Sequence, residues 1–198
     1  MTKQSIYLLT AFWIASLTLA MTTVAYAQEP VTYAPEYCEF QATFPEEPYT
    51  KNICEGDNNE RCYDQVSYTK VFDLDTTVNV RVICNKVSKE LHDTYSGEIM
   101  EATLRAMTAD SVIKTYKTSF REGENYKQAG LVGEGKVGRT STIYIAQLWI
   151  GKKSAFSVEA EVIGEGVDDA DKLFSDILRS IGPKAEKAQV EPSETPEN

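Results

Sequence analysis

Histidine is almost absent from this chain: its 198 residues include only one, His92. A catalytic triad built on histidine would have to pass through this residue. It stands beside Asp93 between two expected elements, which is typical of a helix entry. A conventional zinc site needs several imidazole or thiolate ligands, which one histidine and oxidised cysteines do not supply. We therefore predict no catalytic residue, no metal site and no bound cofactor.

Cys-x-x-Cys pairs are also missing, which argues against a thioredoxin-like redox centre and the common zinc motifs. The chain has an even number of cysteines, Cys38, Cys54, Cys62 and Cys84. In an oxidising compartment, such a set is typical of two structural disulfides. Three pairings are open. We favour Cys54 with Cys62, closing a polar loop, and Cys38 with Cys84, joining two strands.

Basic residues are scarce relative to acidic ones, 20 against 30, so the net charge is −10. Nucleic acids and anionic membrane surfaces select basic patches, and the charge argues against both as partners. An acidic surface keeps an exported domain soluble, and it is also compatible with a basic partner.

A long apolar run occurs at the N-terminus. Lys3 is the only charge before apolar residues 6–20, and the stretch closes with Ala25-Tyr26-Ala27, whose small residues suit signal peptidase. We expect a signal peptide over residues 1–27, a mature chain starting at Gln28, a periplasmic or secreted location, and no stable membrane insertion after cleavage. The alternative is a single uncleaved anchor, because residues 6–27 are nearly long enough to span a bilayer. Lipid anchoring is not expected, because no cysteine follows the run.

The first half of the mature chain predicts mainly strands. Residues 28–36 form an extended lead-in, and residues 37–44 alternate apolar with polar side chains as in a half-buried strand. Residues 46–61 have the composition of a loop. Two strands follow, joined by a turn at residues 73–76.

The second half predicts two helices around a meander of strands. An apolar stripe at three-and-four spacing predicts a helix over residues 93–109, capped by Asp93 or Ser96. A second helix, the most periodic segment of the chain, ends at Gly182-Pro183. We therefore expect one α+β domain over residues 37–182, with a twisted antiparallel sheet of about six to seven strands packed by two helices, and a disordered acidic tail over residues 183–198. The four strands expected between the helices are 112–120, 126–134, 140–150 and 154–163.

Three other features could carry chemistry, and each has a simpler explanation. Glycines 130, 133, 135 and 138 lie between antiparallel strands, so they suit turns and bulges better than a phosphate loop. Acidic clusters at residues 57–60, 73–75 and 168–171 lack the twelve-residue calcium pattern. Trp149 is either a buried strand aromatic or an exposed surface for a partner.

The order of elements then becomes informative, together with residues 40–48 (FQATFPEEP) and the closing helix end at residues 178–181 (LRSI). Over residues 37–182 the chain resembles the PsbP-like and DcrB-like superfamily of small α/β sandwich domains. The resemblance implies a PsbP-like sandwich and a binding or assembly role, since most members are not enzymes. The four cysteines and the acidic tail depart from the pattern, and no functional residue can be transferred by position.

The expected function is therefore that of an exported, non-catalytic binding or assembly protein whose partner is an unidentified component of the cell envelope. Two alternatives remain. One is an envelope enzyme built on carboxylates or tyrosine hydroxyls, which a pocket of convergent buried carboxylates would favour. The other is a secreted interaction or effector protein, and an apolar patch around Trp149 would favour partner binding.

Overall fold

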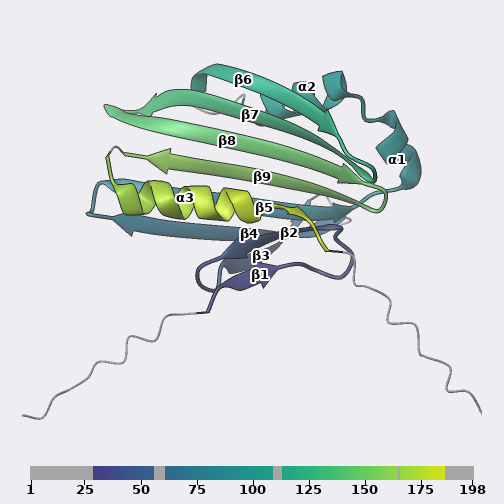
Figure 1. Cartoon of the computed structure of the whole chain (residues 1–198), viewed down its shortest axis with the longest axis horizontal. Coiled ribbons are helices and arrows are strands. Elements are labelled where there is room, and N and C mark those ends of the chain that lie inside the picture. Colours follow the sequence, from purple (N-terminus) through teal and green to yellow (C-terminus); the bar gives the residue numbers. More distant parts are fainter. Residues whose placement is uncertain (1–28, 56–60, 109–112, 165, 186–198) are drawn as a thin grey trace, which may run out of the picture.

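The computed structural model describes residues 29–55, 61–108, 113–164 and 166–185. Within these residues, strands and helices follow one another as in Figure 1. The strands are β1 (Val31–Tyr33), β2 (Phe40–Phe44), β3 (Tyr49–Glu55), β4 (Arg61–Phe72), β5 (Thr76–Lys86), β6 (Ile113–Glu122), β7 (Tyr126–Val137), β8 (Thr140–Gly151), β9 (Ser154–Ile163) and β10 (Gly182–Pro183). The helices are α1 (Lys89–Thr94), α2 (Gly97–Met107) and α3 (Asp168–Ser180). None of these helices is long and apolar enough to cross a bilayer.

The strands form one large antiparallel sheet and one small one. The large sheet has seven strands in the order β3-β4-β5-β9-β8-β7-β6. Pairing of β5 with β9 joins the two meanders, β3–β5 and β6–β9. The small sheet, β1-β2-β10, lies beside the large one at the bottom of Figure 1. The predicted α+β class and antiparallel sheet are confirmed, with a second small sheet in addition.

Helices α3 and α2 pack on opposite faces and over different halves of the large sheet. Helix α3 lies across β5 and β9 in Figure 1, and its buried Phe174 and Ile177 join a core with Val80 and Val158. Helix α2 packs on β6, β7 and β8, where it buries Met100 and Leu104 in a second core. We call these the α3-side core and the α2-side core. Because α3 and α2 lie on opposite faces and over different halves, each face of the sheet has one half that neither helix covers.

The small sheet is fastened to the large one next to Cys38. The Cys38–Cys84 disulfide links the segment before β2 to the end of β5. The carboxylate of Glu39 accepts hydrogen bonds from the backbone N–H groups of Lys153 and Ser154, at 2.7 and 2.9 Å. On the other side of β2, the backbone N–H of Thr43 donates to Ser180 Oγ at the end of α3.

The helix predicted over residues 93–109 corresponds to α2, and a separate short helix, α1, precedes it. Ser88 caps α1 by accepting from the backbone N–H of Leu91, and Ser96 caps α2 by accepting from that of Ile99. Between them Tyr95 has an extended backbone, which ends one helix before the next begins. Ser96 is therefore the cap of the longer helix, and Asp93 lies inside α1.

Two strands occupy segments for which the sequence predicted loop or lead-in. Strand β3 lies within predicted loop 46–61, and β1 lies within lead-in 28–36. Both are held by pairing with a neighbour, β3 with β4 and β1 with β2. At the other end, β10 pairs with β2, and the backbone N–H of Lys184 donates to the carbonyl of Glu39. The predicted leader, and the part of the tail from residue 186 onward, lie outside the described residues.

Candidate functional site

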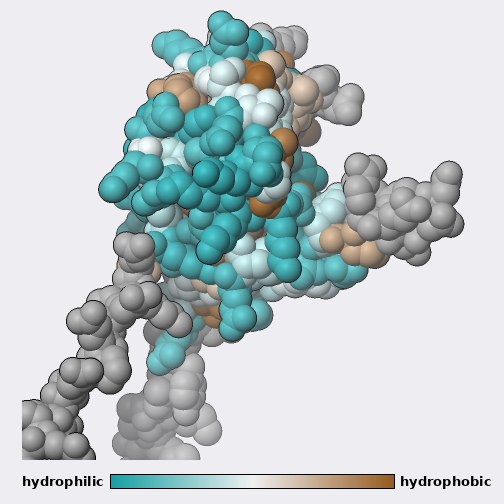
Figure 2. Space-filling model, turned by 90° about the vertical axis from the view of Figure 1, so that its right-hand side faces the viewer, coloured by the Kyte–Doolittle hydropathy of each residue, from teal (hydrophilic) through white to brown (hydrophobic). Residues whose placement is uncertain are grey.

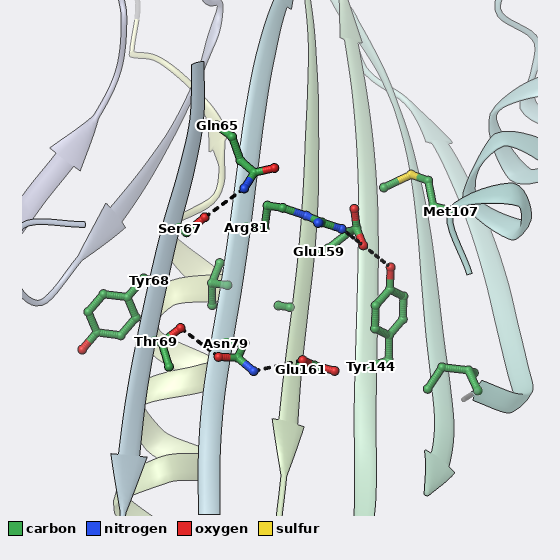
Figure 3. A pocket seen from close by; sticks show the side chains of 13 residues that line it. Gln65, Ser67, Tyr68, Thr69, Asn79, Arg81, Met107, Tyr144, Glu159 and Glu161 are labelled. Atoms are coloured by element: carbon green, nitrogen blue, oxygen red, sulfur yellow. Dashed lines mark hydrogen bonds and ion pairs between the residues drawn. The ribbon is translucent and has the colours of Figure 1, made fainter. Parts of the chain in front are cut away.

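The uncovered half of the α2-side face carries a polar hollow of about 540 Å³ (Figure 3). Its floor is formed by alternate side chains of β4, β5 and β9, and one wall contains Met107 from the end of α2 and Ile113 from β6. The opposite face of the same strands belongs to the α3-side core, where Val80 and Val158 are buried. Strand alternation thus separates an apolar core from a polar floor.

The floor consists of two rows that cross neighbouring strands. Register places Ser67 opposite Arg81, and Arg81 opposite Glu159. The next row, two residues along each strand, holds Thr69, Asn79 and Glu161, and ends at Tyr144 on β8. Directly opposite residues in an antiparallel pair lie on the same face and within contact distance. Each row is therefore continuous across the sheet.

The Glu159 carboxylate of the first row contacts Arg81 in the same row and the hydroxyl of Tyr144, which reaches across from the second row. Arg81 Nη2 lies 2.6 Å from Glu159 Oε2, and the Tyr144 hydroxyl donates to the same oxygen at 2.9 Å. The side chain of Arg81 is 47% exposed, while that of Glu159 is 21% exposed. The guanidinium therefore keeps N–H donors facing the hollow while it orients the carboxylate.

In the second row, hydrogen bonds run in one direction. Thr69 Oγ1 donates to Asn79 Oδ1 at 2.9 Å, and Asn79 Nδ2 donates to Glu161 Oε1 at 3.0 Å. This chain fixes the orientation of the Asn79 amide. The row presents oriented donors and acceptors to a ligand.

Burial and the charge of Glu159 keep Tyr144 protonated and Arg81 positively charged. Burial raises the pKa of Tyr144, and the charge of Glu159 and the hydrogen bond to it raise it further. Partial burial alone would lower the pKa of Arg81, but the hydrogen bond and the charge of Glu159 outweigh this and raise it. Near neutral pH, Tyr144 is therefore a neutral donor and Arg81 a cation. This is the opposite of the lowered tyrosine pKa that would produce a phenolate nucleophile.

The two predicted disulfides are present with the favoured pairing. Cys38 bonds to Cys84 with a Cα–Cα distance of 6.2 Å, and Cys54 bonds to Cys62 with a Cα–Cα distance of 4.0 Å. The second bridge joins directly opposite residues of β3 and β4. The loop that it closes includes the acidic cluster at residues 57–60, which lies outside the described residues.

Trp149 is not a surface for a partner, which corrects that alternative. Its side chain is 2% exposed because it faces the α3 side of β8, where other aromatic rings cover it. Its ring centroid lies 5.7 Å from that of Phe40 and 5.4 Å from that of Tyr126, and the Arg121 guanidinium covers it at 5.3 Å. The end of the molecule that carries α1 is mostly hydrophilic, with small separate hydrophobic patches (Figure 2).

The remaining candidates from the sequence lie apart from the hollow. His92 lies in α1 rather than between elements, and its Nδ1 pairs with Asp93 Oδ1 at 3.1 Å. Within the described part of the chain, no three metal-ligating side chains cluster closely enough to hold an ion. Gly138 has a positive φ of 64° in the turn between β7 and β8, as predicted. Glycines 130, 133 and 135 are instead within β7 itself.

The residues of the hollow carry no sequence signal that marks them as a site. Asn79 and Arg81 alternate with valines in β5, and Glu159 and Glu161 alternate with apolar residues in β9. That pattern marks them as the solvent side of two strands. It does not reveal that β5 and β9 are neighbours, and this pairing brings Arg81 to Glu159.

Comparison with known proteins identifies the fold. No protein-family model matches the chain, and no curated protein matches it. Among solved structures, cyanobacterial PsbP (CyanoP) of Synechocystis superposes with a TM-score of 0.50 at 14% identity, over 82% of this chain and 96% of that one. The fold is PsbP-like. LpqN of Mycobacterium tuberculosis, described as involved in cell envelope biogenesis, is more distant, with a TM-score of 0.40 and 11% identity over 81% of this chain and 88% of that one.

Proposed function

We propose that this PsbP-like protein is an exported, non-catalytic accessory factor that binds a component of the bacterial cell envelope through the polar hollow. The observation that carries the proposal is the pair of hydrogen-bonded rows on the floor of the hollow. Their side chains orient one another, so they present a fixed pattern of donors and acceptors. A partner bound there loses less free energy to ordering of the site.

Export is supported by the cysteine chemistry and by the N-terminal sequence. Two disulfides are typical of proteins that fold in an oxidising compartment such as the periplasm. The apolar run and the Ala25-Tyr26-Ala27 motif are typical of a cleaved leader. Together they favour a periplasmic or secreted protein.

The hydrogen bonds and protonation states of the polar groups in the hollow favour binding over catalysis. Glu159 already accepts from Arg81 and Tyr144, and Glu161 accepts from Asn79. A nucleophile or general base has to be deprotonated when it reacts, whereas Tyr144 is held neutral and Arg81 is held as a cation. Arg81 and Tyr144 serve better as donors to a polar ligand.

The test compares two arginine variants in a pull-down from the envelope fraction. Arg81→Gln removes the charge from the hollow, and we expect it to leave the fold intact because the Arg81 side chain is 47% exposed. Arg179→Gln makes the same change at a 78% exposed arginine on α3, on the opposite face of the sheet. We expect Arg81→Gln to reduce capture of the specific partner about tenfold or more and Arg179→Gln to leave it unchanged. Equal capture by wild type and both variants would refute the hollow as the binding site.

A parallel activity screen addresses the alternative of a carboxylate enzyme. The purified exported protein is assayed against ester, phosphate, peptide and glycoside substrates, together with Glu159→Gln and Glu161→Gln. We expect no turnover. Turnover that disappears in either glutamine variant would replace the binding proposal with an enzymatic one.

A further inference from the structure

Strand β6 is an open edge of the large sheet. It pairs with β7 from Thr115 to Glu122, and no other strand of the described residues lies along its second side. In Figure 1 this strand forms the upper border of the sheet. Alternate residues of an edge strand turn their N–H and C=O groups outward, where another strand can pair with them.

Aromatic side chains lie along one side of this edge. Tyr116 and Phe120 are 42% and 38% exposed. Both lie on the α2 side, because the neighbouring Thr118 on that face donates to Glu101 of α2 and the Phe120 ring lies against Gly97. These rings offer apolar contact to every fourth position of an added strand.

Basic side chains lie along the other side. Lys117 and Arg121 are exposed on the α3 side, where the Arg121 guanidinium covers Trp149. The whole chain has a net charge of −10, so these cations form a local exception. Lys117 and Arg121 are four residues apart, which places them at the same spacing as Tyr116 and Phe120.

This charge pattern discriminates between occupants of the edge. Antiparallel pairing of two β6 strands centred on Ser119 would place Lys117 of one copy opposite Arg121 of the other. Like charges directly opposite destabilise a strand pair, and edge lysines are a common protection against self-association. An acidic strand would instead gain two ion pairs. The edge thus disfavours a second copy in this register, and its two cations favour an acidic segment.

We propose that β6 binds an extended acidic segment of a partner protein by strand addition, independently of the polar hollow. In an antiparallel arrangement, the segment residue opposite Arg121 is acidic and the next one, opposite Phe120, is apolar. The same pair recurs four residues later, opposite Lys117 and Tyr116. The segment therefore has the pattern acidic-apolar-x-x-acidic-apolar, and its backbone supplies the hydrogen bonds.

The test uses labelled synthetic peptides and the full exported protein. The probe peptide TEVTTEVT carries the pattern, TKVTTKVT reverses its charges, and a version of the probe with N-methylated central residues removes backbone donors. Fluorescence anisotropy measures affinity, and ¹⁵N–¹H NMR shifts locate binding. We expect the acidic peptide to bind about tenfold or more tightly than the other two, with weaker binding at high salt and shifts centred on β6.

Matched variants locate the charge effect. Lys117→Glu combined with Arg121→Glu should reduce affinity for TEVTTEVT at least about tenfold and favour TKVTTKVT instead. Lys51→Glu reverses a single charge at an exposed position of β3, the opposite edge of the sheet, and should leave affinity unchanged. Equal binding of both peptides would overturn the proposal, as would NMR shifts in the hollow instead of β6. So would an absence of acidic-peptide binding combined with self-association of the neutral variant Lys117→Gln with Arg121→Gln, because the lysine and arginine would then serve only to prevent aggregation.

Discussion

Removal of each disulfide separately should reduce stability by amounts that differ with the length of chain each bridge closes. Cys38 and Cys84 are separated by 46 residues, and Cys54 and Cys62 by 8. The loss of chain entropy in the unfolded state then gives about 4 kcal/mol for the first bridge and about 2.5 kcal/mol for the second. Cys38→Ala with Cys84→Ala should therefore destabilise the protein by about 1.5 kcal/mol more than Cys54→Ala with Cys62→Ala.

The burial of Cys38 and Cys84 increases the expected difference in free energy of unfolding between the two disulfide variants. Cys38 and Cys84 are each 2% exposed within the α3-side core, so their alanine variants also lose packing. Urea unfolding measures both free energies. Trp149 fluorescence is a suitable signal, because this buried tryptophan is the only one left once a leader ending at Ala27 is removed. Alanine keeps the site apolar, whereas serine would bury an unpaired hydroxyl. Equal losses, or a larger loss for the Cys54–Cys62 variant, would refute this reasoning.

Three further predictions concern the ends of the chain, the core and alkaline pH. The intact mass of the exported protein should correspond to a start at Gln28, and should rise by about four hydrogens on reduction, one pair for each bridge. Phe40→Ala should lower the free energy of unfolding in urea by about 3 to 5 kcal/mol, because Phe40 is 1% exposed and packs against three aromatic rings. The control Tyr49→Ala, at a 69% exposed position, should lower it by less than about 0.5 kcal/mol. Burial and the hydrogen bond to Glu46 raise the pKa of Tyr68 to about 12, so the unfolded tyrosine loses its proton first. The free energy of unfolding should then fall as pH rises from about 10 through 12, and less steeply in Tyr68→Phe.

The sequence predicts the elements that bury a regular apolar face. Strands β2 and β9 alternate buried and half-buried residues along their whole length, and the periodic stripe of α3 includes its buried Ala170, Phe174 and Ile177. Strand β3 lacks that signal because it lies at an edge of the sheet: Lys51 and Asn52 are exposed and Ile53 is half-buried. Its conformation depends on pairing with β4, a contact that local composition does not encode.

The candidate site was less predictable than the fold for a related reason. Alternation places Arg81 and Glu159 on the solvent side of their strands, but these residues are far apart in the sequence. Their contact depends on the pairing of β5 with β9, which sets Arg81 opposite Glu159. A register shift of one residue would turn each side chain to the other face. The exposed aromatics and cations of β6 become an edge surface only through the strand order.

That strand order also determines whether the two proposed surfaces can be used together. The floor of the hollow lies mainly on β4, β5 and β9, and β8 and β7 separate β9 from β6. Three strand spacings place β6 roughly 14 Å from β9, and an added strand would lie about 5 Å further out. The hollow reaches β6 only at Ile113, outside residues 116–121 that would contact the peptide, so a ligand on its floor and a peptide on β6 are expected to bind together. It follows that Arg81→Gln should leave peptide affinity at β6 unchanged, and that charge reversal at Lys117 and Arg121 should leave capture by the hollow unchanged. Loss of both activities in either variant would mean that one partner spans the two surfaces.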